Sequence, residues 1–195
     1  MSLSYCEIIG MSFHFSMLEK LLLALAAIIG VFLVYIAFLP PEYTVERSIN
    51  ITTPISQVFS EVNDFRRWDA WSPWAKIDPN AKTTFSWPSS GEGAVFGWEG
   101  NKDIGKGTMR IVESRPNELI SFSSEFVEPF AGKSETQFTF KPADQIGNQT
   151  HVTWSMSGSN NFLMRIFCFV FDGKGMIGQD MEKGLEQLKA VAQSR

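Results

Sequence analysis

The sequence predicts an α+β protein in which a curved antiparallel sheet of about seven strands wraps on a long C-terminal helix, preceded by one transmembrane helix. Three features support this prediction. An uncharged apolar run lies near the N-terminus, strand-like segments with alternating side chains fill the middle, and the C-terminal segment repeats apolar residues every three or four positions. A helix with one apolar stripe cannot bury that stripe alone, so it needs the sheet to pack against.

The apolar run begins at Leu21 and ends at Leu39. As a helix it would be roughly 28 Å long at about 1.5 Å per residue, close to the thickness of a bilayer core. A cleaved signal peptide is the alternative, but the residues up to Leu39 contain no small-x-small cleavage site before Pro40 and Pro41. The sequence therefore predicts an N-terminal tail at 1–19, a membrane anchor at 20–39 and one domain at 40–195.

The charges beside this run indicate its orientation. Lys20 and the amino terminus lie on one side, and Arg47 lies on the other. The positive-inside rule then predicts a single-pass membrane protein whose domain lies on the outer, periplasmic or extracytoplasmic, side. Met11 and Met17 are alternative starts to Met1, and a start at Met17 would leave a compact signal-anchor.

The middle of the chain predicts an antiparallel meander. The expected strands are bounded by Gly, Pro, Asn or Ser and lie at 42–52, 83–87, 94–100, 105–113, 118–127, 133–140 and 149–156. Two short helices are expected between the first two strands, opening near Thr53 and Asn63. Alternation makes one face of the sheet aromatic and the other polar.

The C-terminal helix is predicted over 175–193, with an apolar stripe that includes Ile177, Met181 and Leu185. The segment just before it, 162–171, is apolar nearly all round and too short to span a bilayer. One interpretation makes this segment the first turns of the C-terminal helix, buried over the sheet edge with a break at 172–175. The other makes it an exposed lid that touches the membrane.

The inward face and the tryptophan-rich loop supply the predicted ligand-binding residues. Trp74 follows Pro73, so it lies on irregular backbone, and the loop tryptophans either plug the core or line a cavity mouth. The predicted set is Trp71, Trp74, Phe85, Trp87, Met109, Ile111, Phe122, Phe138, Phe140, Trp154, Met156, Ile177 and Met181.

Little in the sequence indicates catalysis. His151 alternates with inward residues and is expected on the outer face, while Glu99 becomes a weak candidate acid only if its strand turns it inward, where burial would raise its pKa. No tyrosine stands in the meander. The histidines, His14 and His151, have no nearby cysteine pair, so neither a metal site nor a cofactor is predicted.

The composition argues against nucleic-acid binding and against a disulfide. The net charge is −4 without a block of Lys or Arg, which excludes the usual footprint of a nucleic-acid-binding protein. Cys6 and Cys168 lie on opposite sides of the apolar run, so no disulfide between them is expected.

Several stretches resemble the SRPBCC superfamily, which includes polyketide cyclase/dehydrase-like and START-like lipid-transfer proteins. They begin at Tyr43 (Tyr-Thr-Val-Glu-Arg-Ser-Ile), Trp71 (Trp-Ser-Pro-Trp), Gly97 (Gly-Trp-Glu-Gly), His151 (His-Val-Thr-Trp-Ser-Met) and Gly178 (Gly-Gln-Asp-Met-Glu-Lys-Gly). The resemblance covers about 41–193 and implies a helix-grip fold with a cavity between the sheet and the C-terminal helix. The chain closely resembles the membrane-anchored polyketide-cyclase-like proteins of bacteria.

The resemblance implies a cavity rather than one reaction. The first hypothesis is a membrane-tethered binding protein for a hydrophobic small molecule, either lipid-like or polycyclic. The alternative is an enzyme of the cyclase/dehydrase type acting in the same cavity, which would need an inward carboxylate, histidine or tyrosine. A third hypothesis is that the interior is filled and the domain contacts a partner. The expected partners are the ligand and the membrane.

Overall fold

The structure is a computed structural model and describes residues 16–195. The chain divides into two compact units, Met1–Leu39 and Pro40–Arg195, and each is described by itself. The first contains α1 (Met17–Phe38), whose N-terminus is capped reciprocally. The Ser16 side chain accepts from the Glu19 amide, and the Glu19 carboxylate accepts from the Ser16 amide. Within residues 16–195, α1 is long and apolar enough to cross a membrane, and a signal sequence would have the same properties.

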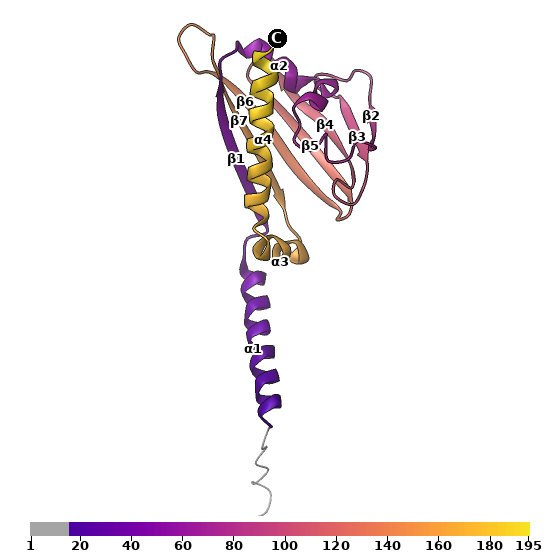
Figure 1. The fold of residues 1–195 in the computed structure, drawn as a ribbon, viewed down its shortest axis with the longest axis vertical. Helices are drawn as coiled ribbons and strands as arrows, with labels where there is room; N and C mark the ends of the chain where they lie inside the picture. Colours follow the sequence, from indigo (N-terminus) through magenta and orange to yellow (C-terminus); the bar gives the residue numbers. More distant parts are fainter. Residues whose placement is uncertain (1–15) are drawn as a thin grey trace, which may run out of the picture. The chain divides into compact units, whose positions relative to one another are not determined.

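The second unit is built on a seven-stranded antiparallel sheet, as predicted (Figure 1). Its spatial order is β1-β7-β6-β5-β4-β3-β2, so six consecutive strands form a meander and the first strand returns to pair with the last. The strands are β1 (Glu42–Ile51), β2 (Lys82–Phe85), β3 (Val95–Glu99), β4 (Lys106–Arg115), β5 (Leu119–Glu128), β6 (Gly132–Pro142) and β7 (Thr150–Ser159).

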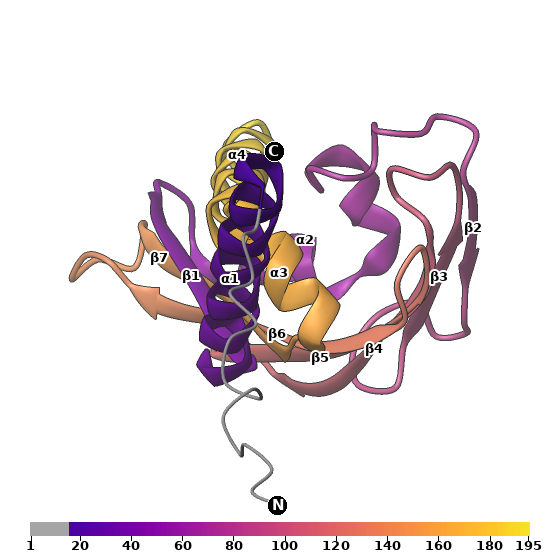
Figure 2. The ribbon, with the colours of Figure 1, turned by 90° about the horizontal axis from the view of Figure 1, so that it is seen from below.

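The sheet is strongly curved, and the helices of the second unit lie on its concave side (Figure 2). The pairing of β4 with β5 shifts register between Lys106 and Gly107, and again between Ile111 and Glu113. Such irregularities bend a strand and increase its local twist. The curvature lets α2 (Ile55–Asn63), the 3₁₀ helix η1 (Phe65–Ala70) and α4 (Gly173–Gln193) pack on one aromatic face.

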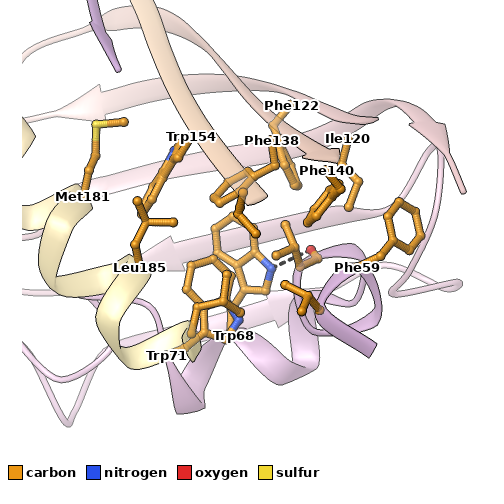
Figure 3. Packing of buried hydrophobic residues seen from close by; sticks show 14 of the residues in the cluster. Phe59, Trp68, Trp71, Ile120, Phe122, Phe138, Phe140, Trp154, Met181 and Leu185 are labelled. Carbon is orange, nitrogen blue, oxygen red and sulfur yellow. Dashed lines mark hydrogen bonds between the residues drawn. The ribbon is translucent and has the colours of Figure 1, made fainter. Parts of the chain in front are cut away.

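That face forms a densely packed aromatic core (Figure 3). Trp71 is fully buried, and its ring makes edge contacts with Phe138 and Trp154 at centroid distances of 5.9 and 6.1 Å. The indole N–H of Trp71 donates to the Glu61 carbonyl, and that of Trp68 donates to the Val62 carbonyl. These hydrogen bonds allow two tryptophans to be buried without leaving an indole N–H unpaired.

Two glycines let α4 approach its neighbours closely. A Cβ at Gly184 would lie 2.8 Å from the Trp154 ring and 2.9 Å from Pro73. A Cβ at Gly178 would overlap the guanidinium of Arg47, which forms an exposed ion pair with Glu182. The first position faces rigid groups and the second faces the end of a flexible side chain.

The segment before α4 forms a separate helix, α3 (Phe162–Val170), with no buried residue. The interpretation that it continues the C-terminal helix and is buried over the sheet edge is therefore wrong. Asp172 adopts a left-handed conformation with φ of 51°, which interrupts the helix, and its side chain then accepts from the Gly175 amide to cap α4. The predicted break at 172–175 lies at this position.

Candidate ligand cavity

Most of the predicted ligand-binding residues lie together on the concave face. They have relative exposures of 9% or less and form one core cluster: Trp71, Met109, Ile111, Phe122, Phe138, Phe140, Trp154, Met156 and Met181. Trp74 and Ile177 are half-buried against this cluster. The side chains contact one another, so this part of the interior is filled with rings.

Two residues of the predicted second strand are exposed and lie outside the core cluster. Trp87 is 87% exposed and Phe85 is 42% exposed. The prediction extended strand alternation to Trp87, but β2 ends at Phe85 and Trp87 stands in the bend before Pro88. Phe85 still contacts the ring of Phe96, with centroids 5.4 Å apart, at the open edge of the sheet.

A cavity of about 330 Å³ lies at one end of the concave face, beside the aromatic cluster. Its volume is at the lower end of the range for small-molecule sites. Its walls come from β1, the β5–β6 hairpin, the turn before β4, α3 and the start of α4. The apolar lining consists of Tyr43, Ile104, Phe126, Pro129, Phe130, Ala131, Met164 and Ile177. Of the thirteen predicted ligand-binding residues, Ile177 is the one in this lining.

Tyr43 brings a phenol to the cavity from the first strand. It pairs with Gly158 of β7, and a Cβ at Gly158 would lie 2.8 Å from the Tyr43 hydroxyl and 2.9 Å from its ring. The ring therefore rests across Gly158 on the concave face. Burial raises the pKa of Tyr43, and the neighbouring Cys168 raises it further. The hydroxyl accordingly stays protonated at neutral pH and can donate a hydrogen bond.

Cys168 faces the cavity from α3 as a free thiol. Its sulfur accepts a hydrogen bond from the Asn160 side chain, with Nδ2 and Sγ 3.7 Å apart. Burial raises the pKa of Cys168, although this hydrogen bond and the charge of Lys174 oppose the change. Cys6 lies outside the described residues.

A row of buried hydroxyls lies one side-chain repeat further along the sheet from the cavity. Ser124 and Ser134 pair directly across β5 and β6, two residues from the lining residues Phe126 and Gly132. Thr136 follows Ser134 on the same face. All three are at least 95% buried, and their hydroxyls have no hydrogen-bond partner. An unpaired buried hydroxyl costs about 1–3 kcal/mol, so a polar atom placed here would be stabilised.

The two candidate acid–base residues lie away from the cavity. The Glu99 side chain is exposed, and the hydrogen bond and charge of Lys106, 3.0 Å away, lower its pKa. The condition for a catalytic Glu99 therefore fails, because Phe96 and Trp98 are the inward residues of β3. His151 is half-buried next to Asn50, with Nδ1 and Oδ1 2.7 Å apart, while Val152 and Trp154 are buried. The predicted register of β7 is therefore confirmed.

In the described residues 16–195, no group of three or more His, Cys, Asp or Glu side chains could hold a metal ion. The ionisable groups at the cavity are instead single residues from separate elements. The structure thus brings together a phenol, a thiol and apolar walls, and the lining also includes four exposed charged residues, Asp103, Glu128, Lys133 and Lys174.

Sequence reasoning missed Tyr43 and Cys168 for identifiable reasons. The search for a tyrosine was confined to the meander, whereas β1 pairs with β7 at the far edge of that meander. The alternation of β1 does place Tyr43 and Val45 on one face, so the signal was present. Cys168 carried no such signal, because its orientation depends on the break at Asp172.

The fold and this cavity define a START-like helix-grip protein. Residues 42–193 match the family described as polyketide cyclase / dehydrase and lipid transport, and the chain belongs to that family. No curated protein matches the sequence of this chain.

Solved structures share the fold at low identity. A protein from Mesorhizobium loti is 17% identical with a TM-score of 0.57, covering 78% of this chain and 98% of that one. The Aha1 dimer from Colwellia psychrerythraea is 15% identical with a TM-score of 0.55, covering 77% and 96%. A protein from Nitrosospira multiformis is 19% identical with a TM-score of 0.54, covering 76% and 94%. These similarities concern the fold alone.

Proposed function

We propose that this protein is a membrane-tethered binding protein for a hydrophobic small molecule, which it holds in the cavity between the sheet, α3 and the start of α4. The observation that carries the proposal is the cavity of about 330 Å³ with largely apolar walls. Burial of apolar surface stabilises a complex by about 25 cal/mol per Å². A lipid-like or polycyclic molecule can bury more apolar surface against these walls than a polar metabolite can, so it should bind more tightly. The family description, which includes lipid transport, supports the same class.

The ligand that fits best carries one polar group on an apolar body. Ser124, Ser134 and Thr136 leave three buried hydroxyls without partners, and the Tyr43 hydroxyl lies at the cavity beside Gly158. A hydroxyl or carbonyl group of a ligand can exchange a hydrogen bond with the Tyr43 hydroxyl, and the three unpaired hydroxyls lie one side-chain repeat from the lining. Burying a charged group there would cost far more, since no basic side chain lies among the three hydroxyls.

A cyclase or dehydratase acting in the same cavity is the second candidate, and Tyr43 is the observation that favours it. A phenol can serve as a general acid. Its raised pKa keeps the proton in place at neutral pH, which suits donation of a hydrogen bond more than abstraction of a proton. Glu99 and His151 lie on the outer side of the sheet, and the carboxylates that line the cavity, Asp103 and Glu128, belong to exposed residues. Neither is buried as a tuned general base would be, so binding is favoured.

The tether is part of the proposal. We infer that α1 anchors the chain and that the domain lies on the outer side of the membrane, with Lys20 on the inner side. Residues 1–19, 20–39 and 40–195 then form the tail, the anchor and the domain.

Native mass spectrometry of the full chain, purified in mild detergent, tests the binding function. We expect an additional small-molecule mass that is lost in Cys168→Phe, because the larger side chain fills the cavity from α3. The matched control is Ile146→Phe, which enlarges an exposed side chain in the turn between β6 and β7. Retention of the same mass by Cys168→Phe would place the ligand elsewhere, and absence of any bound molecule together with no binding of the apolar fluorophore N-phenyl-1-naphthylamine would refute the function.

A further inference from the structure

We propose that α3 is an interfacial helix whose outer side lies in the boundary between headgroups and acyl chains of the bilayer, so that the cavity opens towards lipid. This inference rests on the proposed membrane tether. It assigns to α3 an interaction surface whose partner is the lipid bilayer itself.

The first observation is that α3 is apolar on two sides. Met164 and Cys168 point into the cavity. The outward stripe follows helical spacing and consists of Leu163, Phe167, Val170 and Phe171, all exposed. The rings of Phe167 and Phe171 contact each other with centroids 4.8 Å apart. A helix that uses one apolar side for the cavity leaves the second side for another apolar phase.

The second observation concerns the other wall of the cavity. Phe130, in the turn between β5 and β6, lines the cavity and is also exposed. Met176, in the first turn of α4, is exposed as well. Exposed apolar side chains therefore occur in α3 and in the β5–β6 turn, which both line the cavity, and in the first turn of α4. These side chains would be wet if the domain stood free in water.

The third observation is the position of α3 along the chain. The amide of Asn160 donates to the carbonyl of Pro41, with N and O 2.8 Å apart. Asn160 directly precedes Asn161, the N-cap of α3, and Pro41 is two residues beyond Leu39. An extended chain spans at most about 3.6 Å per residue, so the beginning of α3 is held within a few residues' reach of the end of the apolar run.

These observations favour a bilayer over a protein partner. The apolar run must leave the membrane at its end, so the hydrogen bond to Pro41 holds α3 close to the membrane surface whatever the orientation of the domain. Attachment of the chain also raises the local concentration of lipid, so that even a weak contact is populated. The sequence of α3 contains no acidic residue, which suits a surface of anionic lipids.

The consequence for the proposed function is a direct route for the ligand. Met164 and Cys168 form part of the cavity wall, and the stripe lies on the adjoining side of the same helix. A hydrophobic molecule could pass between the bilayer and the cavity along α3 without crossing water.

The test measures the depth of single fluorescent labels in the full chain, reconstituted in vesicles of phosphatidylcholine with a minor share of phosphatidylglycerol. In a background of Cys6→Ser and Cys168→Ser, bimane is attached at Leu163→Cys, which replaces a side chain that is 73% exposed. Lipids spin-labelled near the top of the acyl chain should quench this label several-fold more strongly than a label at Ile146→Cys. Ile146 is 81% exposed. The turn between β6 and β7, which contains Ile146, lies at the end of the domain away from α3 (Figure 1).

A second label, at Val170→Cys on the same stripe, should be quenched like that at Leu163, and an unchanged near-ultraviolet circular dichroism spectrum shows that each variant is folded. Equal quenching at Leu163 and Ile146 in folded protein would overturn the proposal and leave the stripe as a surface for a protein partner. Because these labels report depth and not ligand, the proposal can fail while the cavity still binds, and the reverse also holds.

Discussion

At the scale of single residues, the cavity keeps two ionisable side chains away from water. Tyr43 approaches from the first strand and Cys168 from α3, and burial raises the pKa of both. The folded protein therefore binds these protons more tightly than the unfolded chain does. Their contribution to stability is present below the unfolded pKa values and is lost as the pH rises through the folded ones.

Alkylation of Cys168 provides a measurement of this effect. The thiolate is the reactive form, so in a Cys6→Ser chain the reaction with iodoacetamide should be slower in the folded protein than in guanidinium at pH 7–8. The rate should then rise above pH 9, beyond the pKa of about 8.5 of an ordinary thiol. Equal rates for the folded and unfolded chains at neutral pH would mean that Cys168 is open to solvent.

Single residues also show where sequence reasoning succeeded. In β7 the alternation predicted buried Val152, Trp154 and Met156, and all three are buried because a long strand with one covered face fixes its register. The prediction that Trp87 faces inward is wrong because β2 ends at Phe85, before Trp87. Glu99 lies in a five-residue strand, where alternation of apolar side chains alone left two registers open.

At the scale of elements, α4 packs through its glycines, and the structure predicts opposite results for two of them. Gly184→Ala places a methyl group against Trp154 and Pro73, which are held by the aromatic core. Overpacking of this kind costs about 1–3 kcal/mol, against a gain in helix propensity of about 1 kcal/mol. We expect a net loss of up to about 2 kcal/mol in the free energy of unfolding.

Gly178→Ala is the matched comparison. Its methyl group displaces the guanidinium of Arg47, an exposed and flexible group whose ion pair with Glu182 is worth at most about 1 kcal/mol. The gain in helix propensity offsets this loss, so the free energy of unfolding should change by less than about 1 kcal/mol. Urea denaturation of the full chain in detergent, followed by tryptophan fluorescence, measures both variants. A larger loss in Gly178→Ala than in Gly184→Ala would contradict this account of α4.

The elements themselves were predictable to within a few residues, apart from the segment 162–171. The period and composition of this segment fit a buried helix as well as an exposed one, because its own apolar residues occur on nearly all sides of the helix. Two features of the structure distinguish the buried from the exposed helix: the left-handed turn at Asp172 and the position of Met164 in the cavity wall. Both features depend on tertiary structure. The sequence thus predicted the break but could not predict which side of the helix is covered.

At the scale of the whole molecule, the role of α1 is the property that most affects function. If α1 is an anchor, carbonate extraction should leave the full-length chain in the membrane pellet, with a mass that includes residues 20–39. This follows because an apolar helix of this length pays a large hydrophobic cost on leaving the bilayer. A shorter, carbonate-released product would identify α1 as a cleaved signal sequence.

The cavity was the part of the whole molecule that the sequence could not locate. Alternation identified the inward face, but the centre of that face is filled by Trp71, Phe138 and Trp154. The empty volume lies next to a row in which small residues, Ser124, Ser134 and Gly158, pair across neighbouring strands. Such a row becomes visible only when the register between strands is known.

The glycines of α4 have a consequence for the order in which the molecule is made. The helix contains four of them, at 173, 175, 178 and 184, and each lowers the propensity of an isolated helix by about 1 kcal/mol relative to alanine. Isolated α4 is therefore unstable, and it follows all seven strands in the chain. During synthesis the sheet can curl before its cover exists. If the protein binds the hydrophobic molecule proposed above, that molecule could meet the sheet before α4 covers it.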